Sequence, residues 1–170
     1  GLRRLGHAPD LVREVPQLDA AILRHLAFVP ALSGLACPHW DRNAAGLWIG
    51  MGLDTTRHDM MQALLEGVAL RATEVMAAMS ELLPLGGIIS VDGGLSKNPY
   101  FLQFLADALQ KSIAVPGSAE LTALGTARIA MLGAGAKSLP PLPQPKQKIL
   151  PQSFDAAAAR RIFSEAVARA

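Results

Sequence analysis

The chain has 170 residues, of which 51% are hydrophobic and 18% are charged, and its formal net charge is +2. This balance excludes a disordered or fibrous segment and predicts one globular domain with a core of its own. The charge is too small, and the lysines and arginines too scattered, to favour a nucleic-acid partner. No apolar run reaches the roughly 18–20 residues of a membrane-spanning helix, and no secretory signal opens the chain. We therefore expect a cytoplasmic protein that binds neither nucleic acid nor membrane.

Cys37 is the single cysteine, which excludes an internal disulfide and fits a reducing compartment. We interpret it as a small buried hydrophobe rather than a reactive thiol. The chain opens without methionine, on a pattern typical of the last turn of a helix that Gly6 ends. We expect the chain to be a piece of a longer protein.

Short elements are predicted in the first third of the chain. Residues 8–26 carry two short helical patterns that Pro16 separates. Residues 28–32 and 47–51 are apolar and predict two short strands, joined by a loop rich in Gly, Pro, Asp and Asn.

The clearest helix follows, with Thr55 or Thr56 as its cap and Asp59 in its first turn. Steps of three and four predict one continuous buried stripe, formed by Met61, Leu65, Val68, Ala72, Val75, Met79 and Leu82. The polar residues are expected mostly away from that stripe; they are Asp59, Gln62, Glu66, Thr73 and Glu81. Gly67 costs about 1 kcal/mol relative to alanine inside a helix, so another segment is expected to pack very close to it.

A paired-glycine turn is the most informative segment of the chain. The strand predicted at 88–91 leads into Gly93 and Gly94, and a helix is predicted from Pro99 to Leu109. Asn98 suits the N-cap of that helix and Pro99 its first position. Backbone without Cβ atoms beside a helix N-terminus suits contact with a phosphate or a nucleotide, and plain strand-to-helix packing is the alternative.

The last third continues the alternation of strands and helices. A strand at 113–115 precedes a helix at 119–132, which Ser118 caps and whose small residues at 123–127 allow close helix approach. A proline-rich, extended strap is predicted at 139–151, and a terminal helix at 154–168. The alternation predicts the α/β class.

Common catalytic motifs are not matched. The run 133–138 resembles the end of a P-loop but lacks its required glycines, and it ends a helix where a P-loop begins one. No third glycine completes a Rossmann fingerprint after Gly94, and the four histidines have no partners at metal-ligand spacing. A dyad of Cys37 and His39 is not favoured. From residue chemistry we assign no catalytic residue and no metal ligand.

Four segments, in this order, resemble the C-terminal domain of the FGGY carbohydrate kinases. They are Pro30–Leu35 with Pro38–Asp41; Gly46–Gly50 with Ala63–Gly67; Val91–Gly94 with Ser96 and Asn98; and Thr122–Ala127. The resemblance extends from about Phe28 to Gly135. It implies an actin-like, ribonuclease H-like ATPase fold with a mixed sheet flanked by helices.

The resemblance also implies a place in a larger enzyme. Residues 1–170 would be the nucleotide-side lobe alone, since the N-terminal domain that carries the catalytic aspartate is absent. ATP and Mg²⁺ would be the cofactors, with the magnesium held mainly by that missing domain. Gly94 and Asn98 would contact the nucleotide, Gly93 would give backbone clearance, and Gly125 would be a packing residue near the interdomain hinge.

The implied reaction is transfer of the ATP γ-phosphoryl group to a hydroxyl of a sugar or polyol, and the fragment alone is expected to be inactive. Trp40 after Pro38-His39, with Gly34-Leu35 before them, favours a glycerol-like acceptor. Cys37 and His39 depart from the usual glycerol kinase residues, so xylulokinase-like and gluconokinase-like substrates stay open. A non-catalytic actin-like regulatory domain and a nucleotide-free structural domain stay open as well, and so does a homo-oligomer.

Overall fold

The structure is a computed structural model that describes residues 19–117, 121–142 and 144–170. The predicted helix end at Gly6 and most of the first helical patterns lie outside the described residues. In chain order the elements are η2 (Ala21–Arg24), β1 (Ala27–Val29), β2 (Leu47–Ile49), α1 (Arg57–Leu82), β3 (Ile88–Ser90), η3 (Gly94–Lys97), α2 (Pro99–Leu109), β4 (Ser112–Pro116), α3 (Leu121–Gly133), β5 (Pro145–Ile149) and α4 (Ala156–Val167), where η denotes a 3-10 helix. The α/β class is as predicted.

Two small sheets organise the strands. β1 and β2 pair antiparallel, with Phe28 opposite Trp48 and their rings 4.5 Å apart. In the second sheet β4 lies between β3, which runs parallel to it, and β5, which runs antiparallel. The predicted mixed sheet is therefore present. Parallel β3 and β4 bring their carboxyl ends to the same edge of this sheet.

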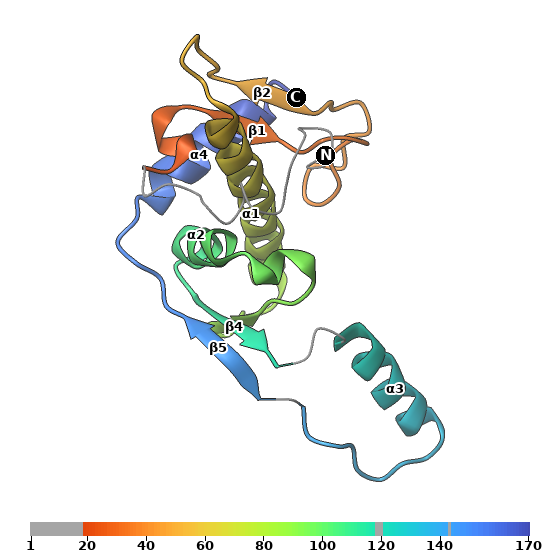
Figure 1. Ribbon diagram of the computed structural model, residues 1–170. Helices are drawn as coiled ribbons and strands as arrows, with labels where there is room; N and C mark the ends of the chain where they lie inside the picture. The colour runs from red at the N-terminus through yellow and green to blue at the C-terminus, as the bar shows by residue number, and fades with distance from the viewer. Residues whose placement is uncertain (1–18, 118–120, 143) are drawn as a thin grey trace.

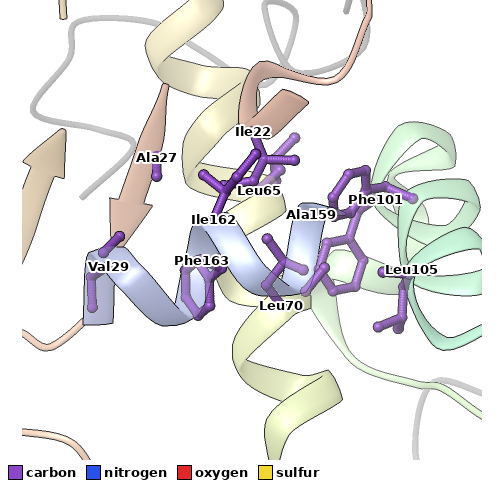
Figure 2. Close-up of a cluster of buried hydrophobic side chains, with 14 of the residues drawn as sticks. Ile22, Ala27, Val29, Leu65, Leu70, Phe101, Leu105, Ala159, Ile162 and Phe163 are labelled. Atoms are coloured by element: carbon purple, nitrogen blue, oxygen red, sulfur yellow. The ribbon is translucent and has the colours of Figure 1, made fainter. Parts of the chain in front are cut away.

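The core lies where α1, α2 and α4 meet β1 (Figure 1). Figure 2 shows Phe163 of α4 beside Leu65 and Leu70 of α1, with Phe101 of α2 closing the cluster. Phe163, Leu65 and Leu70 are each at most 1% exposed. Burial of large apolar side chains from four segments distant in sequence is the main force that holds these elements together.

Side-chain caps define the starts of α1 and α4, and the sequence predicted the cap of α1. Thr56 is the N-cap of α1; its hydroxyl accepts the Asp59 amide while the Asp59 carboxylate accepts the Thr56 amide, a complete capping box. The side-chain bond with Thr56 is the main cause that lowers the pKa of Asp59 to about 2. At α4 the carboxylate of Asp155 accepts the amide of Ala158, so that helix begins at Ala156 rather than at the predicted 154.

Gly67 sits where α1 crosses β1. A Cβ on this residue would lie 2.0 Å from the carbonyl oxygen of Phe28. The prediction of a very close neighbour is confirmed, because only hydrogen fits between the helix and the strand.

The predicted buried stripe of α1 is wrong in two ways. Gln62, Glu66 and Thr73 were expected away from the stripe, yet they are 1%, 1% and 4% exposed. Met79 and Leu82 were expected inside, yet they are 45% and 84% exposed. The reason is that α1 packs against β1, η2 and α2 along its first two-thirds, where its buried residues lie, and not along its last turns. Enclosure, and not periodicity, sets burial along this helix.

The proline-rich strap contains a strand that the sequence did not reveal. β5 pairs with β4, with Ile149 opposite Ile113, and the pairing shifts register between Val115 and Pro116. Leu150 and Gln152 then continue over α2, where the Leu150 carbonyl accepts a bond from Gln103. The strap looked irregular because its pairing partner, β4, lies 29 to 36 residues earlier in the chain.

Helix α3 stands apart from the rest of the molecule (Figure 1). None of its residues is buried, although Ile129, Met131 and Leu132 are apolar and exposed. The residues predicted to begin and cap it, 118–120, lie outside the described residues. Nothing among the described residues lies within 4 Å of a Cβ placed on Gly125, and its role as a packing residue near the interdomain hinge stays a prediction.

Candidate functional site

The glycine turn leaves the sheet at the end of β3. The Val91 amide still pairs with the carbonyl of Ala114, and the chain then reverses through Gly93, whose φ is 88° and ψ is −170°. That backbone conformation favours glycine over any residue with a Cβ. The Ser96 hydroxyl and amide both bond to the Gly93 carbonyl, at 2.7 and 3.2 Å, and close η3.

The surroundings of the turn are open. A Cβ built on Gly93 or on Gly94 meets no atom within 4 Å, and both glycines are exposed. Gly94 itself does not have a positive φ. The turn therefore presents accessible backbone to solvent, as a site for a flat or phosphorylated ligand requires.

Asn98 and Pro99 begin α2 as the sequence predicts. The Asn98 side-chain oxygen accepts the Phe101 amide at 2.9 Å, and Pro99 occupies the first helical position. Asn98 is 6% exposed, so its carboxamide belongs to the helix cap and to the floor of the turn. Its predicted contact with a nucleotide stays a prediction.

A pocket of about 390 Å³ lies at the carboxyl edge of β3 and β4. Ser90 and Pro116 form its sheet side, and α3 contributes Leu121, Gly125 and Arg128. The glycine turn begins three residues after Ser90, at the same end of β3. The edge of the sheet thus carries two neighbouring features, an open turn and a mostly apolar pocket.

A buried polar network that sequence patterns did not reveal joins α1 to η2 and to the start of α2. Glu66 accepts the amides of Ala21 and Ile22 at 2.8 and 2.7 Å and the hydroxyl of Tyr100 at 2.5 Å. The Gln62 amide also donates to the Tyr100 oxygen, at 2.9 Å. The available signal was that Glu66 has apolar neighbours three positions away in both directions, Ala63 and Ala69, so that a solvent-facing position was improbable.

The pKa values of Glu66 and Tyr100 are both shifted within this network. Burial raises the pKa of Glu66, while the bonds donated by Tyr100 and by the amides of Ile22 and Ala21 oppose that rise. Burial, followed by the neighbouring Glu66 charge, raises the pKa of Tyr100 above its usual value. The phenol therefore stays protonated and donates to the carboxylate.

Cys37 and His39, the dyad that the sequence did not favour, make structural contacts. His39 lies 3.3 Å from Glu74 rather than against the Cys37 thiol, and Cys37 is half-buried. Arg71 donates to the Cys37 carbonyl and to Glu74, which ties the loop to α1. Within the described ranges no three His, Cys, Asp or Glu side chains gather closely enough to hold a metal ion. No helix in that part of the chain has the length and apolar character needed to cross a membrane.

Comparison with known proteins decides the family. The family model for the C-terminal domain of the FGGY family of carbohydrate kinases matches residues 4–134. The chain belongs to this family. It is 44% identical to a glycerol kinase of Thermus brockianus over 117 residues, and 37% identical to one of Lactococcus lactis over 136 residues. These matches cover 68% and 79% of this chain but 24% and 27% of the relatives, so the FGGY chain spans about a quarter of their length.

Solved structures agree on the fold. The FGGY chain matches Plasmodium falciparum glycerol kinase with ADP at a TM-score of 0.80 and 26% identity, covering 98% of this chain and 35% of the other. It matches a xylulose kinase from Rhodospirillum rubrum at 0.69 and 26%, covering 94% and 32%. The expected actin-like fold, of which this chain forms a C-terminal part, is thereby confirmed.

Proposed function

We propose that this chain is the nucleotide-side lobe of an ATP-dependent kinase that phosphorylates a hydroxyl of glycerol or a similar polyol. The observation that carries the proposal is the open Gly93-Gly94 turn above the capped start of α2. Its support is the family membership and the set of glycerol kinases that are 34–44% identical to the chain. Xylulose and gluconate kinases share the fold, so these acceptors are the second candidates.

The residues of the turn fit an adenine nucleotide. Gly93 and Gly94 leave room for a ligand to approach the backbone, and Asn98 fixes the helix start below it. ATP, when bound, supplies the phosphoryl group. This lobe binds and orients the nucleotide, and catalysis of this type depends on positioning and on neutralising charge. The Mg²⁺ that accompanies ATP is proposed to be held mainly by the N-terminal domain.

The partner of this lobe is proposed to be the protein's own N-terminal domain, seated on α3. Support comes from the exposure of an apolar helix with a bare Gly125 beside the pocket at the sheet edge. Small residues at a helix surface allow another backbone to approach closely. The catalytic base and the acceptor-binding residues then belong to that domain.

The reaction is tested with the full-length protein and ATP. ADP release is measured with glycerol, xylulose, ribulose and gluconate, and turnover with glycerol in preference to the others is expected. Turnover with none of them, in a protein that still binds ATP, would favour the non-catalytic regulatory domain.

The site is tested with Gly94→Val in the same protein. This change is expected to raise the KM for ATP about tenfold or more while leaving the melting temperature unchanged, because a Cβ at Gly94 has no described protein atom within 4 Å. Gly87→Val is the matched control, since Gly87 is equally open but lies at the other end of β3. Equal ATP affinity in both variants would contradict the assignment of the turn.

A further inference from the structure

Tyr100 joins the glycine turn to the buried network on α1. We propose that the bond from its hydroxyl to Glu66 positions the turn for nucleotide binding, which makes Tyr100 a positioning residue. This inference rests on the proposed function of the turn. It concerns a contact between α2 and α1, outside the glycine turn itself.

The turn is fixed through its two ends and through Leu95. Gly93 and Gly94 have open surroundings, whereas Leu95 of η3 is partly buried against the core. At one end the Val91 amide is held to Ala114 of β4. At the other end the chain enters α2, so the position of the α2 start decides where the exposed backbone lies.

Tyr100 anchors that second end. It is the second residue of α2, two positions after Asn98, and its ring stacks on Phe104 with centroids 6.1 Å apart. Its hydroxyl reaches across to α1, where Glu66 accepts it at 2.5 Å and Gln62 donates to it at 2.9 Å. The first turn of α2 is thereby tied to α1 by directional bonds as well as by apolar packing.

The anchor on α1 is itself rigid. Glu66 is 1% exposed and is held by the amides of Ala21 and Ile22. Gln62 is oriented in turn by the Arg24 guanidinium at 3.1 Å, and Arg24 pairs with Asp59 at 2.8 Å. Bonds to a charged group in a buried environment are strong, and leaving one acceptor unfilled is costly. The network therefore has one preferred arrangement, which it imposes on the start of α2.

The test uses Tyr100→Phe in the full-length protein. The ring and its packing on Phe104 are kept, and only the hydroxyl is lost. The dissociation constant of ADP, measured by calorimetry, is expected to rise about fivefold, as the loss of one bond to a charged group allows. The KM for ATP should rise similarly, whereas kcat should change less than about twofold, since the acceptor and the base are untouched.

Thr73→Val is the matched control. It also removes one buried hydroxyl, here from α1 itself, and among the described residues that hydroxyl bonds to the Leu70 carbonyl of its own helix, at 2.7 Å. It should lower the melting temperature without changing ADP affinity. A Tyr100→Phe variant that likewise loses thermal stability but binds ADP as tightly as the wild type overturns the inference.

Hydrogen exchange gives a readout that does not need activity. Amides at 92–98 should exchange faster in Tyr100→Phe than in wild type, and unchanged exchange there overturns the inference. The result also separates the two claims: a wild-type protein that fails to bind ADP contradicts the proposed function, whereas equal ADP binding by wild type and Tyr100→Phe contradicts only the role of Tyr100.

Discussion

The packed body of the molecule and its α3 arm show how differently one chain can use apolar residues. In the body, Phe163 and Leu70 are at most 1% exposed and are covered from several elements. In α3, Ile129 and Leu132 are 72% and 55% exposed, and the helix has no buried residue. Figure 1 shows α3 set off from the three helices of the body. The difference teaches that apolar composition predicts a tendency to be buried, while the covering surface decides whether burial occurs.

The sharpest test of this contrast truncates one apolar side chain in each region. Phe163→Ala should lower the free energy of unfolding by about 3–5 kcal/mol, because it removes a fully buried ring from the core. Ile129→Ala should change it by less than about 0.5 kcal/mol, since the side chain is already in water. Urea unfolding of the chain measures both. A large loss at Ile129 would mean that α3 is packed in solution.

A second pair compares two helical glycines. Gly67→Ala should destabilise the chain by about 3 kcal/mol, because its Cβ would overlap the Phe28 carbonyl at 2.0 Å and force α1 away from β1. Gly125→Ala should instead stabilise it by about 0.5–1 kcal/mol, through helix propensity in open space. Thermal unfolding distinguishes the two. The same sign of change at both positions would contradict the contrast.

The proposed docking of α3 predicts an effect that appears only in the full-length protein. Gly125→Leu should lower kcat/KM about tenfold by obstructing the close approach of the N-terminal domain, while making the isolated chain slightly more stable, as Gly125→Ala does. Ala127→Leu is the control, since it lies about 200° away around the helix. Equal losses in both variants would argue against docking through the Gly125 face.

The smallest expected effect concerns the pH dependence of the α1 cap. Because the folded pKa of Asp59 is about 2, below its ordinary 3.8, the unfolded chain takes up the proton first as the pH falls. The stability from this group is therefore present above about pH 4 and lost towards pH 2. Asp59→Asn should cost about 1 kcal/mol at neutral pH, and its difference from wild type should shrink over that window. Glu165→Gln is the control, since it removes an exposed carboxylate paired with Arg161. The stability of each variant is measured by denaturant unfolding at a series of acid pH values.

Sequence reasoning located the residues of the candidate site but not the buried Glu66 network that holds the start of α2. The paired glycines, Asn98 and Pro99 were found because a strand end, a turn and a helix cap leave their signals within ten residues. Glu66 was placed on the wrong side of α1, since its partners Ala21 and Tyr100 lie 45 and 34 residues away. The four family segments identified the fold, although β5 was hidden within a proline-rich run.

The sequence by itself determined the local structure: the threonine cap of α1, the Asn98 cap of α2 and the glycine turn between β3 and α2. These depend on hydrogen bonds and steric limits between near neighbours, so no distant segment is needed to specify them. Only the tertiary structure decided that Glu66 is buried and that Met79, Leu82 and the whole of α3 are exposed. Burial depends on which distant segment covers a surface, and no pattern within a single helix contains that information.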